Sequence, residues 1–330
     1  MTKVLVTGGN GFIGRHLVAN LVASGRQVRV LDLRSPATFL PDVEYINGSI
    51  LDEKLVDESL REIEQVYHLA ALPGLWTRRK VDFHSVNFRG TQIVISAAQR
   101  RGVAKFLHCS SESILSGSSP LGDIAVGHRL PPADEMPGPY TRSKNLAEQF
   151  AIQAAADSFP LVVGTPTMPI GPHDQLTPPT AMLLHFLKGR IQPYVHFVMN
   201  LVDVQDVATG LVLAMERGQC GHRYILGGEN VTLRSVLDRL AVIRGRRNLL
   251  IPVYGSVAEK AAAILEFVAD YVTHKSPSGT AEGVRIALRA KPLSIEKAQR
   301  ELGYSPQPID SALRATIEYL IGGSVRATTL

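Results

Sequence analysis

Short β-branched runs alternate with longer amphipathic segments through the first half of the chain. Residues 3–7 form an apolar run that stops at glycine, and apolar positions of helical period follow from Phe12 to Val22. The same alternation predicts strands at 27–32, 43–46, 65–69, 104–109 and 160–164, with helices at 81–101 and 139–156. Because repeated strand–helix units return the chain to the same sheet, we predict an α/β fold with a doubly wound parallel sheet.

A proline-rich segment at 165–180 interrupts the alternation and predicts a long loop that leaves the sheet. Strand-like runs at 200–204 and 223–227, with a helix between them, predict that the chain then returns to the sheet. Helical patterns and turn signals dominate the rest of the sequence. We therefore predict two discontinuous domains. The larger comprises residues 1–165 plus 198–228, and a smaller, mostly helical C-terminal lobe comprises residues 166–197 plus 229–330.

A glycine-rich turn joins the first predicted strand to the first helix and reads TGGNGFIG at 7–14. Gly8 permits a tight turn, Gly11 lets backbone approach a pyrophosphate, and Gly14 lets the helix pack closely on the sheet. The free N–H groups of the helix start then face the phosphates. Asp32 ends the second strand, where a carboxylate can accept both ribose hydroxyls of an adenosine. Together these positions predict a Rossmann-type dinucleotide site in the larger domain.

Two side chains bear on which dinucleotide is bound. Asp32 favours NAD, because a carboxylate would repel the 2′-phosphate of NADP. Arg34 leaves NADP as an alternative, because its guanidinium could bind that phosphate. An ordinary turn beside an exposed aspartate is the plain alternative to a cofactor site, but it does not explain the coincidence of the three glycines with the acid.

Tyr140 and Lys144 lie four residues apart in the predicted helix 139–156, so their side chains share one face. A free phenol has a pKa of about 10, and a neighbouring ammonium together with an oxidised nicotinamide would favour the phenolate. This combination predicts a general acid/base. Ser110 and Ser111 end the strand that precedes the helix, and either could place a hydroxyl beside the phenol.

Several segments in order make the chain similar, over nearly its whole length, to extended short-chain dehydrogenase/reductases. They are TGGNGFIG at 7–14, HLAA at 68–71, NFRGT at 87–91, YTRSK at 140–144, PIGPHD at 169–174, LVDVQDVA at 201–208, YILGG at 224–228 and ELGYSP at 301–306. The resemblance implies that Ser111 orients the substrate carbonyl, that Tyr140 is the acid/base, and that Lys144 holds the nicotinamide ribose and lowers the tyrosine pKa. Asn87 is expected near the site, and His68 is expected to be structural.

The resemblance also implies a set of cofactor and substrate contacts. The cofactor residues are Gly8, Gly11, Phe12, Ile13, Gly14, Asp32, Arg34, Ile50, Ala70, Ala71, Tyr140, Lys144 and Thr167. The substrate residues are Ser111, Glu112, Met168 and Asn200. No histidine forms a spaced cluster with Cys, Asp or Glu, so we expect no metal site.

The sequence also distinguishes among the reactions of the resembled superfamily. Its dehydratases carry Asp-Glu directly after the strand-end hydroxyl, whereas this chain has Glu112 and Ser113, which disfavours elimination. Met168 and Asn200 stand where nucleotide-sugar enzymes often carry groups suited to a sugar diphosphate. Lys188 or Arg190 could still supply positive charge for one. The chain most resembles hopanoid-associated sugar epimerases. It is similar also to 3β-hydroxysteroid dehydrogenases, dihydroflavonol reductases and 2-alkyl-3-oxoalkanoate reductases. Its segment ALPGLW at 71–76 resembles the apolar loop of that reductase branch.

We therefore predict an NAD(P)-dependent oxidoreductase that moves hydride between nicotinamide and a secondary alcohol or ketone of a largely apolar substrate. The alternatives are an NAD-dependent nucleotide-sugar epimerase and a non-catalytic dinucleotide-sensing protein. A homodimer is expected from the resemblance alone.

Composition narrows the setting of this activity. The 35 basic and 30 acidic residues give a net charge of +5, too weak an excess to indicate nucleic acid. Two cysteines, no leader-like start and no run of 18 apolar residues favour a cytoplasmic protein without a membrane span. The helical run 257–272 puts Glu259, Glu266 and Asp270 on one side and aliphatic residues elsewhere. We expect this helix to pack on the lobe, with contact to a membrane surface as the weaker alternative.

Overall fold

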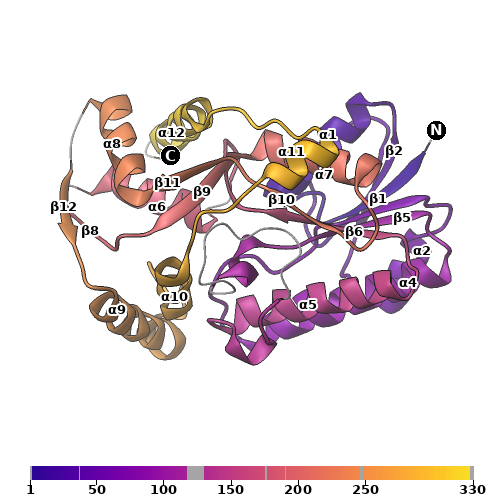
Figure 1. Ribbon diagram of the computed structural model, residues 1–330, viewed down its shortest axis with the longest axis horizontal. Coiled ribbons are helices and arrows are strands. Elements are labelled where there is room, and N and C mark those ends of the chain that lie inside the picture. The colour runs from indigo at the N-terminus through magenta and orange to yellow at the C-terminus, as the bar shows by residue number, and fades with distance from the viewer. Residues whose placement is uncertain are drawn as a thin grey trace.

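The computed structural model describes residues 2–36, 38–116, 130–174, 177–189, 191–245 and 248–327. Seven parallel strands form its central sheet, in the order β10-β6-β5-β4-β1-β2-β3 (Figure 1). The strands are β1 (Lys3–Thr7), β2 (Gln27–Asp32), β3 (Val43–Asn47), β4 (Gln65–His68), β5 (Lys105–Cys109), β6 (Leu161–Pro166) and β10 (Arg223–Leu226). The strand order reverses beside β1, where α/β sheets bind ligands at the carboxyl ends of their strands. The predicted doubly wound fold is confirmed.

Helices cover both faces of this sheet, as the alternating pattern requires. Helices α1 (Phe12–Ala23), α7 (Val204–Arg217) and α11 (Glu296–Leu302) pack on one face, and α2 (Glu53–Ser59), α4 (Gly90–Arg100) and α5 (Pro139–Ala156) pack on the other. Figure 1 shows α5 along the lower side of the sheet and α1 with α7 along the upper side. Val4, Leu5 and Val6 are fully buried, which explains why β1 is apolar at successive positions rather than alternating.

The helix predicted at 81–101 is not continuous. It consists of α3 (Val81–Phe83), the π-helical turn η1 (His84–Arg89) and α4. A π turn inside a helix places one extra residue in the turn, and such turns are frequent at functional sites. Here the turn contains Asn87, which is fully buried.

A second group of elements forms the lobe, at the left of Figure 1. Its strands are β7 (Met168–Ile170), β9 (Val198–Asp203) and β11 (Glu229–Thr232) in one sheet, and β8 (Ile191–Tyr194) with β12 (Leu249–Pro252) in another. Its helices are α6 (Pro178–Lys188), α8 (Leu233–Arg244), α9 (Gly255–Val268) with the π turn η4 (Ala269–Thr273), α10 (Ala281–Arg289) and α12 (Ile309–Ala327).

Two predictions about the segment 165–204 are wrong. The segment 165–180 is not wholly irregular, because β7 lies within it. The strand expected to return to the central sheet at 200–204 is β9, which pairs instead with β7 and β11; the chain rejoins the sheet with α7 and β10. A short apolar run carries no information about which sheet it joins, which is why the sequence did not separate the two. The predicted domain boundaries themselves stay a prediction.

Candidate active site

The glycine-rich turn after β1 is closed so tightly that side chains would not fit. Gly8 has a φ of 72°, and a Cβ there would lie 2.7 Å from the backbone nitrogen of Ala70. A Cβ on Gly14 would lie 2.2 Å from the carbonyl oxygen of Gly8. Gly11 is the N-cap of α1, so the first N–H groups of that helix have no partner inside the helix and face out of the turn. This cradle fits the pyrophosphate of a dinucleotide.

Asp32 and Arg34 lie together beside this turn, as predicted. The carboxylate of Asp32 accepts from the backbone N–H groups of Asn10 and Arg34, each at 3.0 Å. The Asn10 side-chain amide donates to the Arg34 carbonyl at 2.6 Å. The backbone of the turn therefore fixes the orientation of the Asp32 carboxylate at the end of β2, while the Arg34 side chain lies exposed next to it.

The other predicted cofactor residues surround the same strand ends in different ways. Ala70 and Ala71 follow β4 and are half-buried, and the Ala70 N–H donates to the Thr7 hydroxyl at 3.3 Å. Ile50 is buried and packs directly against Gly90, so that a Cβ on Gly90 would collide with the Ile50 side chain. Phe12 and Thr167 are also buried, and Ile13 is partly buried in α1.

Tyr140 and Ser111 come together from α5 and from the segment after β5. Tyr140 lies in the first turn of α5, and the Ser111 side chain lies close enough to its phenol to lower the phenol pKa against the effect of burial. The Ser111 hydroxyl also lies 2.9 Å from that of Ser113. The neighbouring Ser110 hydroxyl is buried without a partner among the described residues. The geometry therefore brings Ser111, rather than Ser110, to Tyr140.

Lys144 lies one helical turn after Tyr140 and is buried. Its ammonium donates to the carbonyl of Cys109 at 2.8 Å, which anchors the start of α5 to the end of β5. Burial lowers the pKa of Lys144 and raises that of Tyr140 to about 12, although the nearby Ser111 side chain opposes the second shift. Positive charge from an oxidised nicotinamide would favour the phenolate against this effect of burial.

Glu282 of α10 is a residue of this site that the sequence analysis missed. Its buried carboxylate accepts from the Thr141 N–H and the Thr141 hydroxyl, both at 2.8 Å, and from the Tyr140 N–H at 3.3 Å. The N-cap residue of α5 is Gly138, where a Cβ would lie 2.4 Å from the Glu282 carboxyl carbon. An acid from a helix distant in sequence therefore caps α5, and no local signal could have indicated it.

Two further polar residues connect the elements around the site. Asn87 accepts from the Leu72 N–H at 2.7 Å and donates to the Ser143 hydroxyl at 3.0 Å, which ties the segment after β4 to α5. His68 bonds Thr7 at 2.7 Å and Thr91 at 3.0 Å through its two ring nitrogens. Burial lowers the pKa of His68 to about 3, so the ring stays neutral. This geometry agrees with the structural role expected for His68.

The predicted substrate residues are placed less uniformly. Glu112 follows Ser111, is half-buried, and has its pKa raised to about 8 by desolvation. Met168 lies in β7 and packs against the lobe core. Asn200 is buried, accepts from the Thr167 hydroxyl at 2.9 Å and from the Gly228 N–H at 2.8 Å, and donates to the Asn230 side chain at 2.9 Å.

The prediction that Asn200 contacts substrate stays a prediction. Its amide is saturated by protein partners that join β9 to neighbouring segments, which sequence position alone could not reveal. Lys188 is exposed at the end of α6, and Arg190 lies outside the described residues. Within the described ranges, no group of three His, Cys, Asp or Glu side chains is arranged to hold a metal ion.

Comparisons with known proteins agree with this geometry. Residues 4–227 match the sequence model of the NAD dependent epimerase/dehydratase family. The chain is 32% identical to a putative dihydroflavonol 4-reductase from Synechocystis over 95% of this chain and 93% of the relative. It is 27% identical to a 3-beta-hydroxysteroid dehydrogenase from Mycolicibacterium neoaurum over 92% of this chain and 87% of the relative. The crystal structure of gox2253 superposes with a TM-score of 0.81 at 28% identity, covering 98% of this chain and 99% of that one.

Proposed function

Because the chain belongs to the NAD-dependent epimerase/dehydratase family, we propose that it transfers hydride between nicotinamide and a secondary alcohol or ketone of a largely apolar substrate. The observation that carries this proposal is the placement of the Ser111 hydroxyl beside the Tyr140 phenol, with the buried Lys144 one helical turn away. It joins a hydroxyl that can orient a carbonyl to a phenol that can exchange its proton.

The glycine turn and Asp32 are the groups that would hold the cofactor. The N–H groups at the start of α1 would bind the pyrophosphate, and the Asp32 carboxylate would accept the ribose hydroxyls. Bound NAD supplies the hydride acceptor or donor of the reaction. We infer a preference for NAD, because a 2′-phosphate would have to approach the oriented Asp32 carboxylate before Arg34 could compensate.

The protein side chains would then manage the proton. In the direction of reduction, Tyr140 donates its phenolic proton to the developing alkoxide, while Ser111 donates a hydrogen bond to the same oxygen. Because burial raises the pKa of Tyr140, the phenol carries its proton before the reduction begins. In the direction of oxidation, Tyr140 accepts the proton of the alcohol, and the positive charges of Lys144 and of the oxidised cofactor favour that step.

The loop 71–76 supports an apolar substrate. It contains Leu72, Leu75 and Trp76, and Leu75 packs against Gly283 of α10, so apolar side chains line the segment between the end of β4 and the lobe. The single acid Glu112 after Ser111 does not complete the Asp-Glu pair expected of a dehydratase. The names of the dihydroflavonol and hydroxysteroid relatives favour the same class of substrate.

A Tyr140→Phe variant tests the proposal. NADH oxidation would be followed with a 3-ketosteroid, a dihydroflavonol and a UDP-hexose as candidate substrates. We expect turnover of at least one of the first two, and a loss of about 10²–10⁴-fold in Tyr140→Phe with unchanged NAD affinity. Tyr271→Phe is the matched control, because it removes the same hydroxyl from an exposed tyrosine outside the site. Full activity of Tyr140→Phe would refute the assignment.

Cofactor retention separates the proposal from the epimerase alternative. An epimerase must oxidise and re-reduce its substrate with the same cofactor, so stoichiometric NAD would survive purification and a UDP-hexose would be converted without net NADH change. An oxidoreductase would exchange NAD(H) freely. An Asp32→Ala variant would move the ratio of NAD to NADP affinity towards NADP.

We also propose a homodimer, which light scattering of the purified protein would test.

A further inference from the structure

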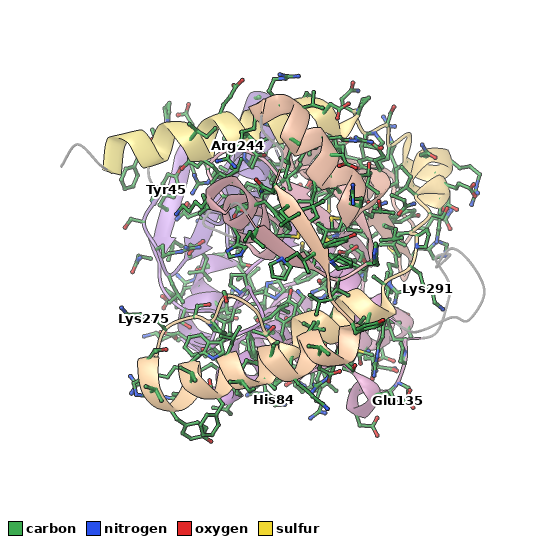
Figure 2. The ribbon with its side chains drawn as sticks, turned by 90° about the vertical axis from the view of Figure 1, so that its left-hand side faces the viewer. Tyr45, His84, Glu135, Arg244, Lys275 and Lys291 are labelled. Carbon is green, nitrogen blue, oxygen red and sulfur yellow. The ribbon has the colours of Figure 1, made fainter. Side chains whose placement is uncertain are left out.

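The outer face of α9 and η4 is apolar, and its acidic face is turned inward. Apart from Ala262 and Ala269, no apolar side chain of this pair of elements is buried in the described structure. At 3.6 residues per turn, the exposed apolar positions other than Ala263 share an arc of about 160° around the helix. We call this arc the α9 face; its exposed side chains are Tyr254, Val257, Ala261, Ile264, Leu265, Phe267, Val268, Tyr271 and Val272. Figure 2 views this end of the molecule, with α9 along its lower part.

The inward face is polar because it pairs with the protein. Glu259 binds Arg285 at 2.7 Å, and Glu266 accepts from the Ala281 N–H at 2.8 Å. Asp270 accepts from the Trp76 indole N–H at 2.7 Å and pairs with Lys80 at 3.3 Å. This is the reverse of an ordinary surface helix, which turns its apolar stripe to the core.

The size of the α9 face exceeds the usual surface patch. Its three aromatic side chains alone would expose about 400 Å², if a complete aromatic side chain is taken as about 200 Å². Tyr254 is 84%, Phe267 61% and Tyr271 72% exposed. The aliphatic side chains carry the face past the roughly 300–600 Å² typical of the largest patch on a monomer. Patches of this kind mark protein or membrane contacts.

The charges around the α9 face indicate which of these contacts it makes. All three acids of α9 and η4 are turned away from it, whereas Lys260 lies within the arc and Lys275 follows its end, both exposed and outside the ion pairs of the described residues. The whole chain carries a net charge of +5. Aromatic and aliphatic side chains flanked by lysines match the boundary between anionic headgroups and acyl chains of a bilayer.

We propose that the α9 face docks on the surface of an anionic phospholipid bilayer. No helix among the described residues is long and apolar enough to cross a membrane, so the contact would be interfacial. The docked helix contacts the loop 71–76 through Trp76, and it packs on α10 where Leu288 approaches Gly255. Docking would therefore place the α10–loop edge of the active site beside the lipid phase.

Flotation of the full-length protein with vesicles tests this proposal without any activity readout. The vesicles would be phosphatidylcholine alone, or phosphatidylcholine with about one third phosphatidylglycerol. We expect the wild type to float with the anionic vesicles, and Ile264→Ser/Phe267→Ser/Tyr271→Ser to bind them at least about tenfold more weakly, because three large apolar side chains would lose their burial. Lys260→Glu/Lys275→Glu should lose the preference for phosphatidylglycerol.

Matched controls distinguish vesicle binding by the α9 face from binding by exposed apolar side chains elsewhere, and from any effect of the proposed chemistry. Phe39→Ser/Val242→Ser removes side chains that are 66% and 82% exposed elsewhere and should bind as the wild type does. Tyr140→Phe should also bind unchanged, so a failure of the proposed chemistry would not affect this result. Thermal unfolding of each variant checks that the fold is intact.

Two outcomes would overturn the proposal. In the first, the wild type remains unbound with both vesicle compositions. In the second, the triple variant changes the oligomeric state in light scattering and leaves vesicle binding unaltered, which would assign the α9 face to contact between copies of the chain.

Discussion

Removal of the Glu282 carboxylate should weaken both the fold and the first turn of α5, which carries Tyr140. In a Glu282→Ala variant the Thr141 N–H and hydroxyl lose a partner at 2.8 Å, and the Tyr140 N–H loses one at 3.3 Å. Gly138 has no side chain that could replace the cap, and Thr141 is fully buried. The Thr141 hydroxyl can still donate to the Gly138 carbonyl at 3.0 Å, whereas the N–H groups of Thr141 and Tyr140 would stay unsatisfied unless water enters.

The expected cost follows from these contacts. Leaving one buried donor unpaired costs about 1–3 kcal/mol, and loss of a helix cap costs about 0.5–2 kcal/mol, so the free energy of unfolding should fall by about 2–4 kcal/mol. Glu282→Gln keeps an acceptor oxygen and loses the charge, so its cost should be about 1 kcal/mol. Urea unfolding followed by circular dichroism measures both values.

Catalysis supplies a second readout that a remote packing defect would not give. Because the carboxylate bonds the backbone of Tyr140, Glu282→Ala should lower kcat by about 10–100-fold through displacement of the phenol. The negative charge of Glu282 also raises the pKa of Tyr140, so both variants should move the tyrosine limb of the pH–rate profile to lower pH. An Ala variant within about 0.5 kcal/mol of the wild type, with an unchanged profile, would refute the capping role.

Three further predictions concern other parts of the site and the sheet. Gly14→Ala places a Cβ 2.2 Å from the Gly8 carbonyl oxygen, so NAD binding measured by calorimetry should weaken at least about a hundredfold, whereas Gly279→Ala, in open space, should bind normally. Burial raises the pKa of Glu112 to about 8 from its ordinary value, so the folded state favours the protonated carboxyl. The free energy of unfolding should therefore decline as the pH rises from about 4.5 to 8. Urea unfolding at pH 5, 7 and 9 should show this decline for the wild type and not for Glu112→Gln. Parallel curves for the two proteins would contradict that reasoning. Arg223→Ala leaves the fully buried Glu148 without its ion-pair partner and should cost about 3–5 kcal/mol, most of which Glu148→Gln/Arg223→Met should restore.

The agreement between sequence and structure is greatest where local chemistry decides the outcome. The strands of the central sheet, the glycine turn and the bounds of α5 follow from short-range patterns, because a buried parallel strand is apolar throughout and a tight turn beside a helix needs glycine. Asp32 and Tyr140 were predicted for the same reason, since each has a fixed offset from one of those elements. The resemblance to a known family then supplied Ser111, whose neighbour Ser110 the spacing alone did not exclude.

The α9 face shows that an amphipathic pattern can be predicted correctly while the side of the helix that faces the protein is predicted wrongly. The separation of acids from apolar residues in 257–272 is visible in the sequence, and we expected the apolar side to pack on the lobe. The structure turns the acids inward, because Arg285, Trp76 and the Ala281 N–H provide partners for them. Those partners come from other elements, so the periodicity of one helix could not reveal its orientation.

By itself, the sequence indicated the elements of the central sheet and the residues proposed to bind the cofactor and exchange the proton, because the signals for these lie within a few residues of one another. Only the tertiary structure decided that β9 joins the lobe sheet, that Asn200 is saturated by protein partners, that Glu282 caps α5, and which side of α9 faces outward. Each of these depends on a pairing between segments far apart in the chain, and such a pairing is selected by the whole fold rather than by local preference.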